Sequence, residues 1–168
     1  MSLKLITAVA TTTLAGTIAL ADQAEINRSI TDIAAGADRH QWDRVRDAFA
    51  DTVTTDYTSL WGGEPSTQTP DELIHAWSAL LPGFDSTHHM VTNETVTSLN
   101  GNLATAEADF TATHRIKDEL WTLGGRYTYK LEHNGDRWLV TSLTMTALWE
   151  TGDRGLVGIA VERVAASQ

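Results

Sequence analysis

Two Asn-Gly pairs, at residues 100–101 and 134–135, constrain the fold of this chain more than any other feature. Asn and Gly accept the positive φ angles of tight hairpins, and each pair separates long segments of alternating apolar and polar residues. A Lys-Asp-Glu turn at 117–119 divides this region once more. The second half of the chain is therefore predicted to be an antiparallel meander of four strands, at 88–99, 103–116, 120–132 and 138–149.

The first half of the chain carries helix signals instead. Asp22 and Glu25 form a capping-box pattern ahead of apolar residues at helical spacing, and Thr69, followed by Pro-Asp-Glu, marks a second strong helix start. The segment 53–61 is rich in β-branched and aromatic residues, which favours a strand. We expect, in order, a helix of about four turns from Asp22, a short helix over 42–49, the strand 53–61, a helix that Pro82-Gly83 ends, and a last short helix over 155–166.

These elements predict an α+β fold, in which about three N-terminal helices pack on one face of a curved antiparallel sheet. Long twisted strands with few covering helices tend to curl into a cone around a pocket. The chain has 168 residues and no repeats or linkers, so it fits one domain, which we place at residues 22–168.

Residues 1–21 have the layout of a secretory signal. A lysine near the start precedes an apolar, Thr/Ala-rich stretch, and Ala-Leu-Ala stands before Asp22 as a cleavage motif. The stretch is short and Thr-rich for a membrane span. The alternative is an uncleaved N-terminal helix or arm. A signal predicts a periplasmic or secreted protein, whereas an arm is compatible with a cytoplasmic one.

Composition excludes several classes of function. The formal net charge is −10 and no run of Lys or Arg could follow a phosphate backbone, so nucleic acid is not an expected partner. The chain has no cysteine, which excludes disulfides and thiolate nucleophiles. None of the motifs for dinucleotide binding, phosphate binding, serine hydrolases or zinc proteases occurs. Histidine, aspartate and tyrosine remain, and these residue types indicate acid/base chemistry without a cofactor.

Strand alternation selects the first candidates. In 103–116 the even positions form an apolar row of small residues that also contains Phe110 and His114, so His114 is expected to face inward. The small alanines of that row leave room for a ligand or for large side chains of a covering helix. His88 and His89 must point to opposite faces of their strand, so at most one of them faces a pocket.

Asp38 and Tyr57 are the other polar candidates. Asp38 lies at the edge of the apolar stripe of its helix, where a carboxylate needs either a partner or a polar cavity. On periodicity alone, a helix-end aspartate that simply reaches solvent is the favoured interpretation. Tyr57 and Trp61 are predicted to share a strand face, where Tyr57 could donate to a substrate carbonyl or be plain core. A metal site built from Asp38, His89 and His114 is a minor alternative without dense ligand spacing, and we expect none.

Together, these segments resemble the SnoaL-like branch of the nuclear transport factor 2-like superfamily, which includes scytalone dehydratase, hexachlorocyclohexane dehydrochlorinase and bile acid 7α-dehydratase. The resemblance covers roughly residues 22–150 and rests on the N-terminal helix, the Thr-Pro-capped helix, the segment 87–93 (Thr-His-His-Met-Val-Thr-Asn) and the C-terminal strand pair. It implies a cone-shaped, cystatin-like α+β barrel with a hydrophobic pocket, assembled as homodimers or homotrimers.

The resemblance also implies roles for particular residues. In the dehydrochlorinase the motif His-x-x-Thr-Asn carries the catalytic base, and residues 89–93 of this chain match it. His89 is thus the expected base and Asp38 the residue that orients it. His114 and Tyr57 are the nearest counterparts of a second pocket histidine and a polarising tyrosine. The ligand is expected to contact Trp61, Asn93, Phe110 and Trp149.

Two functions follow as expectations. The first is a cofactor-independent lyase, similar to a dehydratase, or an isomerase, which acts on a small hydrophobic carbonyl or hydroxy compound. The second is a non-catalytic binding or structural module of the same fold, in which Asp38 and His89 only satisfy each other. In both cases the expected partners are a small hydrophobic molecule and further copies of the chain, with no nucleic acid and no membrane once any signal is removed.

Overall fold

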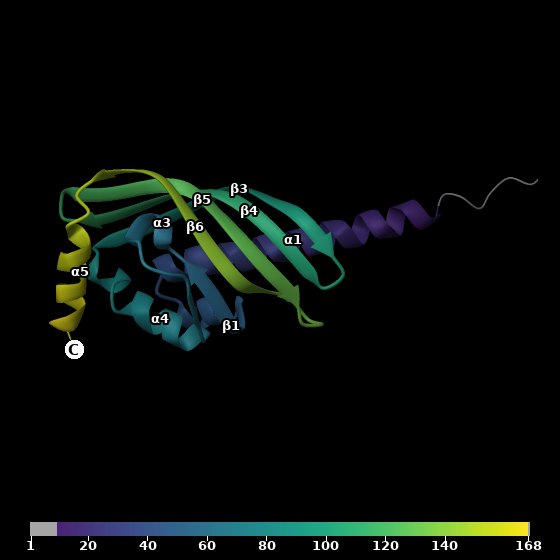
Figure 1. The fold of residues 1–168 in the computed structure, drawn as a ribbon, viewed down its shortest axis with the longest axis horizontal. Coiled ribbons are helices and arrows are strands. Elements are labelled where there is room, and N and C mark those ends of the chain that lie inside the picture. The colour runs from purple at the N-terminus through teal and green to yellow at the C-terminus, as the bar shows by residue number, and fades with distance from the viewer. Residues whose placement is uncertain (1–9, 168) are drawn as a thin grey trace, which may run out of the picture.

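The computed structural model describes residues 10–167 and shows a curved sheet that arches over a long helix (Figure 1). The helices are α1 (Ala10–Asp38), α2 (Trp42–Arg46), α3 (Thr58–Trp61), α4 (Pro70–Ser78), the 3-10 turn η1 (Leu81–Gly83) and α5 (Leu156–Ala165). The strands are β1 (Phe49–Asp56), β2 (Ser66–Gln68), β3 (Ser86–Asn100), β4 (Leu103–Ile116), β5 (Glu119–His133) and β6 (Trp138–Gly152).

The predicted α+β class and the antiparallel meander are confirmed. Strands β3 to β6 pair in sequence order, and Gly101 and Gly135 take the positive φ angles that their hairpins require. The whole sheet has the order β2-β1-β6-β5-β4-β3 and does not close into a barrel. It is mixed and not purely antiparallel, because β1 runs parallel to β6. These two strands are far apart in the sequence, so no local turn signal specified their relative direction.

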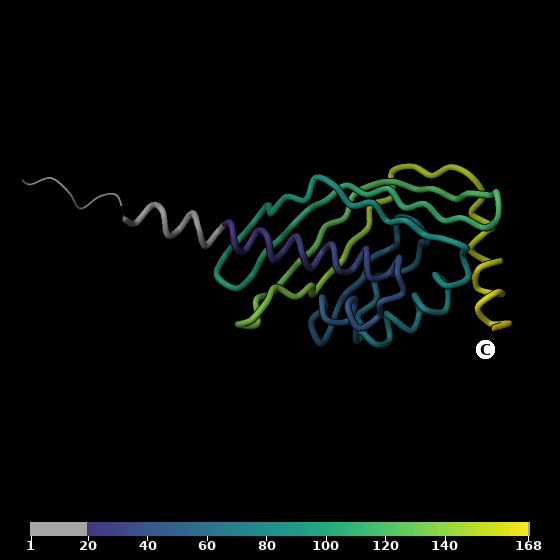
Figure 2. The backbone as a smooth tube through the Cα atoms, turned by 180° about the vertical axis from the view of Figure 1, so that it is seen from behind, coloured from purple at the N-terminus to yellow at the C-terminus, as the bar shows by residue number. Residues whose placement is uncertain are grey.

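Breaks in strand register bend the sheet. The pairing shifts between Thr92 and Thr95 in β3 and between Gly124 and Gly125 in β5. Such bulges insert an unpaired residue and increase the local bend and twist. The concave side that results faces α1 and α4, as the view from behind in Figure 2 also shows.

The concave side of the sheet carries the apolar core. In β4 every even position from 104 to 116 is buried, as the alternation predicted. Helix α1 packs Ile26 and Ile30 into this layer, and Ser29 donates a hydrogen bond to the carbonyl of Trp138 on β6 (2.6 Å). The helix is therefore tied to the sheet by polar as well as apolar contacts.

Several predicted boundaries are wrong. Phe49 already belongs to β1, and β1 ends at Asp56, whose carboxylate accepts hydrogen bonds from the backbone N–H and the hydroxyl of Thr58 (3.0 and 2.7 Å). These bonds start α3. Tyr57 is therefore the N-cap and Trp61 the last residue of a helical turn, and the two do not share a strand face. Helix α1 begins upstream of Asp22, which is therefore not a cap; its carboxylate accepts from the indole N–H of Trp138 (3.1 Å).

The start of α4 and the last helix agree with the prediction. Thr69 accepts from the Glu72 backbone N–H (3.3 Å), and the Glu72 carboxylate accepts from the Thr69 backbone N–H (2.8 Å), which is a complete capping box. Helix α5 occupies 156–165 within the predicted range. Of the segment predicted as a signal or arm, residues 1–9 lie outside the described residues, and residues 10–21 form the first part of α1. None of the described helices is both long and apolar enough to cross a bilayer.

Helix α5 packs against η1 so closely that a methyl group does not fit between them. A Cβ added at Gly83 would lie 2.0 Å from the backbone oxygen of Ala160. We expect Gly83→Ala to lower the free energy of unfolding by about 1–3 kcal/mol, because overpacking forces the helix to shift. The control is Gly158→Ala on the exposed side of α5, where a Cβ meets nothing within 4 Å and helix propensity improves. Urea titrations that showed equal effects for both variants would contradict this packing.

Candidate active site

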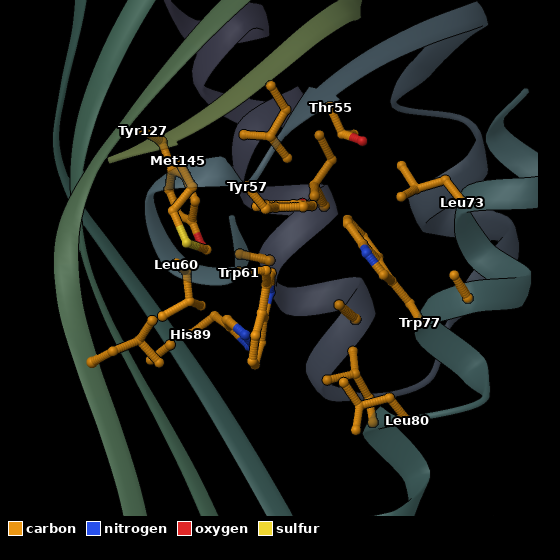
Figure 3. A pocket seen from close by; sticks show the side chains of 18 of the residues that line it. Thr55, Tyr57, Leu60, Trp61, Leu73, Trp77, Leu80, His89, Tyr127 and Met145 are labelled. Atoms are coloured by element: carbon orange, nitrogen blue, oxygen red, sulfur yellow. The ribbon is translucent and has the colours of Figure 1, made fainter. Parts of the chain in front are cut away.

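A cavity of about 340 Å³ lies on the concave side of the sheet. Its wall is mostly apolar and aromatic, and Figure 3 shows many of its side chains. The cavity is lined by Ile33, Ala34, Ala37, Thr55, Tyr57, Leu60, Trp61, Gln68, Leu73, Ala76, Trp77, Leu80, Leu81, His89, Ala112, His114, Trp121, Leu123, Tyr127, Tyr129, Leu143 and Met145. Its size and lining suit a small apolar molecule held by a few polar groups.

Asp38 and His89 meet at the edge of this cavity. Asp38 is the last residue of α1, and its Oδ1 lies 2.6 Å from Nδ1 of His89 on β3. The same carboxylate accepts from the backbone N–H of His89 (2.7 Å) and from the hydroxyl of Thr87 (2.8 Å). A carboxylate is disfavoured at the C-terminal end of a helix dipole, so these three donors are what hold it there.

The electrostatics of the pair fix the proton on His89. Burial raises the pKa of Asp38, but hydrogen bonds from His89 and Thr87 and the charge of His89 outweigh it and lower the pKa to about 2. Asp38 is therefore ionised at neutral pH and can only accept. It follows that Nδ1 of His89 donates its proton to Asp38, so that Nε2 is the ring nitrogen left for the cavity.

His114 lies beside His89 and has no partner for one ring nitrogen. The two rings are 5.3 Å apart and perpendicular, and His114 is stacked on Trp121 at 4.7 Å and packed against Phe84 at 4.9 Å. Burial and the charge of His89 lower the pKa of His114 to about 4, so it is neutral at pH 7. Its Nδ1 is buried without a hydrogen bond although the residue lines the cavity. A buried unpaired polar atom is costly, so this nitrogen is available to bind a ligand atom.

Two tyrosines on the wall remain protonated. Burial, and then the neighbouring Tyr127, raise the pKa of Tyr57 well above its usual value. Burial, and then the charge of Asp38, raise the pKa of Tyr127. Both hydroxyls therefore keep their protons at neutral pH and are available as donors.

Trp61 forms the outer part of the wall. Its side chain is 49% exposed although it lines the cavity, which places it at the mouth. The Arg154 guanidinium lies over its ring at 5.4 Å and binds the Glu150 carboxylate with two hydrogen bonds (2.6 and 2.9 Å). Glu150 also accepts from the indole N–H of Trp121 (3.0 Å), so the mouth is connected to the ring that stacks on His114.

Three residues predicted to contact the ligand do not lie on the cavity wall. Asn93 sits at the β3 bulge with φ of 57°, is exposed, and donates to Asp109 (2.8 Å) on the outer side. The bulge breaks the alternation that would have kept Asn93 on the face of His89. Phe110 is buried against the ring of Tyr127 (4.2 Å), and Trp149 is half exposed against Gly124.

The remaining predicted residues come together. His89 faces the cavity and His88 is exposed on the opposite face, as strand geometry required. Thr87 and Tyr127 were missed, although Thr87 is two residues from His89 and so shares its strand face. Within residues 10–167 no cluster of three His, Cys, Asp or Glu side chains is arranged to hold a metal ion.

The SnoaL-like domain family matches residues 19–144. The Kfla4162 protein from Kribbella flavida has a similar structure, with a TM-score of 0.76 and 26% identity over 84% of this chain and 98% of that one. No curated protein sequence matches the chain significantly.

Two further similar structures, below 20% identity, share the fold. A protein from Novosphingobium aromaticivorans described as a scytalone dehydratase has a TM-score of 0.70 and 15% identity, over 83% of this chain and 92% of that one. A hexachlorocyclohexane dehydrochlorinase from Novosphingobium barchaimii has a TM-score of 0.68 and 18% identity, over 83% and 95%. By its sequence match over residues 19–144, the chain belongs to the SnoaL-like domain family.

Proposed function

We propose that the protein is a cofactor-independent lyase or isomerase that acts on a small hydrophobic carbonyl or hydroxy compound. The observation that carries this proposal is the contact of Asp38 with Nδ1 of His89, which leaves Nε2 as a base on the cavity wall. Two proteins of the same fold are named as a dehydratase and a dehydrochlorinase. Both names denote enzymes that catalyse eliminations, which supports the lyase class.

The first step is proton removal by His89. Its Nε2 takes a proton from the carbon next to the substrate carbonyl, and the C–H electron pair moves toward the carbonyl oxygen. The ionised Asp38 stabilises the imidazolium that forms and keeps the ring in place. Tyr57 and Tyr127 are available to donate to the oxygen on which charge develops, and the unpaired Nδ1 of the neutral His114 can accept a hydrogen bond from a substrate hydroxyl.

The second step completes the reaction without any other reagent. In an elimination, the electron pair forms a C=C bond as the bond to a hydroxyl or halide on the adjacent carbon breaks. The leaving hydroxyl takes the proton from His89 and departs as water, and a halide departs as the anion with the proton released to solvent. In an isomerisation, His89 returns the proton to a different carbon. Each route restores the neutral His89 and ionised Asp38.

A cofactor-free turnover assay tests this function. Hydroxylated and halogenated cyclic ketones are incubated with the protein, and the absorbance of the new conjugated double bond and the released halide are followed. We expect turnover of members that fit about 340 Å³ by the wild type and none by His89→Gln. Equal turnover by both proteins would exclude the mechanism. Ligand binding with no turnover would favour a binding module.

A further inference from the structure

A second polar position lies on the cavity wall away from the histidines. Thr55 on β1 and Gln68 on β2 both line the cavity, and the Gln68 side-chain amide donates to the Thr55 hydroxyl (3.1 Å). The Thr55 side chain is buried, and the cavity residues from the neighbouring elements are the apolar Leu73 and Leu143. Apart from the tyrosine hydroxyls, the indole N–H groups and the two histidines, this pair supplies the only polar side chains among the residues that line the described cavity.

The two polar positions lie toward opposite edges of the sheet and at different heights along its strands. Strands β1 and β2 form one edge of the six-stranded sheet, whereas β4 and β3 form the other. Through the register, Thr55 aligns with Leu143, Tyr129 and then Ala106 on β4, while His89 aligns with Ala112. Six residues along β4 correspond to roughly 20 Å measured along the curved strand, so the straight distance across the concave side is shorter. Figure 3 accordingly shows Thr55 and His89 on opposite sides of the cavity.

The chemistry of the pair suits a neutral oxygen. Thr55 accepts from Gln68 and still has its hydroxyl proton to donate, and the Gln68 carbonyl oxygen is an acceptor. Together they can donate to and accept from one ligand hydroxyl, or donate to one carbonyl. No Asp, Glu, Lys or Arg is among the residues that line the described cavity, so an ionised ligand group would lose its hydration without a counter-charge.

We propose that the ligand is an elongated, largely apolar molecule with an oxygen at each end. The reacting end lies at His89 and His114, and an uncharged hydroxyl or carbonyl at the far end binds Thr55 and Gln68. The placement of the reacting end rests on the proposed function. The second position is independent of catalysis, because it requires only that the cavity bind the ligand.

The test compares two ligands that differ by one hydroxyl. Dissociation constants of 4-hydroxystilbene and 4,4′-dihydroxystilbene, an elongated pair in which the second hydroxyl lies at the far end, are measured by calorimetry for the wild type and for Thr55→Val, which keeps the shape of the side chain. We expect the wild type to bind the diol about tenfold more tightly, since a hydrogen bond to an otherwise buried group contributes this much. Thr55→Val should reduce the ratio of the two constants to about one.

A neighbouring threonine provides the matched control. Thr54 precedes Thr55 on β1, points to the other face, and bonds to the Thr67 hydroxyl (2.9 Å). Thr54→Val should keep the tenfold preference, and Gln68→Leu should lose it, as Thr55→Val does. The proposal is wrong if the wild type shows no preference, if Thr55→Val retains it, or if the wild type binds neither compound.

Failure of this proposal is distinguishable from failure of the proposed function. His89→Gln should lose turnover and keep the preference for the diol, because the far end of the ligand does not contact it. Loss of the preference in His89→Gln would contradict the separation of the two positions. If the wild type shows the preference but no turnover, the second position stands and the lyase function does not.

Discussion

Replacing His89 with Gln is expected to lower kcat by a factor on the order of 10³, since a positioned general base typically contributes 10² to 10⁴. Gln can still donate a hydrogen bond to Asp38 from a side chain of similar length, so the fold and the cavity should survive. It has no basic nitrogen, so the proton cannot leave the substrate. Steady-state kinetics on a substrate identified in the turnover assay should show the loss in kcat with little change in KM.

The neighbouring histidine is the control for this substitution. His88 is exposed on the opposite face of β3, so His88→Gln removes a similar side chain without touching the cavity. We expect its kcat to equal that of the wild type. An active His89→Gln protein, or equal losses in both variants, would rule out His89 as the base. Circular dichroism on both variants separates a loss of chemistry from a loss of fold.

Replacing Asp38 with Asn is expected to lower kcat by a similar factor for a different reason. Asn is uncharged, so it no longer stabilises the imidazolium, and its amide can donate to Nδ1, which would move the ring proton to Nε2. The base would then be blocked while His89 remained in place. Nitrogen NMR of the histidine ring should show a proton on Nδ1 in the wild type and on Nε2 in Asp38→Asn. An unchanged tautomer with an unchanged kcat would contradict this role.

Asp38 also makes stability depend on pH. Its pKa falls from 3.8 in the unfolded chain to about 2 in the folded one, so folding favours the ionised form. The resulting stability, about 1 kcal/mol after allowance for solvent screening, is fully present above about pH 5 and is lost as the pH falls through 4 toward 2. Urea titrations between pH 2 and 6 should therefore show the wild type losing its advantage over Asp38→Asn in that window. A constant difference between the two would contradict the assigned cause.

Local patterns predicted the parts of the fold that local chemistry decides. The Asn-Gly turns and the alternation of β4 gave the meander and the inward position of His114. The strand predicted over 53–61 was too long at its C-terminal end. Its β-branched residues favour a strand, but the Asp56 side chain ends the strand by accepting hydrogen bonds from Thr58. The parallel pairing of β1 with β6 depends on contacts remote in sequence, which no short pattern encodes.

In the candidate site, too, local patterns predicted some residues, whereas contacts remote in sequence decided others. Asp38 and His89 are 51 residues apart, and only the family resemblance suggested that they meet. Helical periodicity alone favoured an Asp38 that reaches solvent. Asn93 was misplaced because one bulge reverses the side-chain directions that follow it. Thr87, in contrast, could have been found, since residues two apart on a strand share a face.

The proposed reaction depends on one step, in which His89, held by Asp38, removes a proton from a carbon next to a carbonyl. The most direct measurement is deuterium exchange into 2-tetralone, a small bicyclic ketone, followed by proton NMR in D₂O. We expect the wild type to accelerate loss of the α-proton signal well above the buffer rate and His89→Gln not to do so. Equal exchange rates for the two proteins, or a wild-type rate equal to that of buffer, would contradict it.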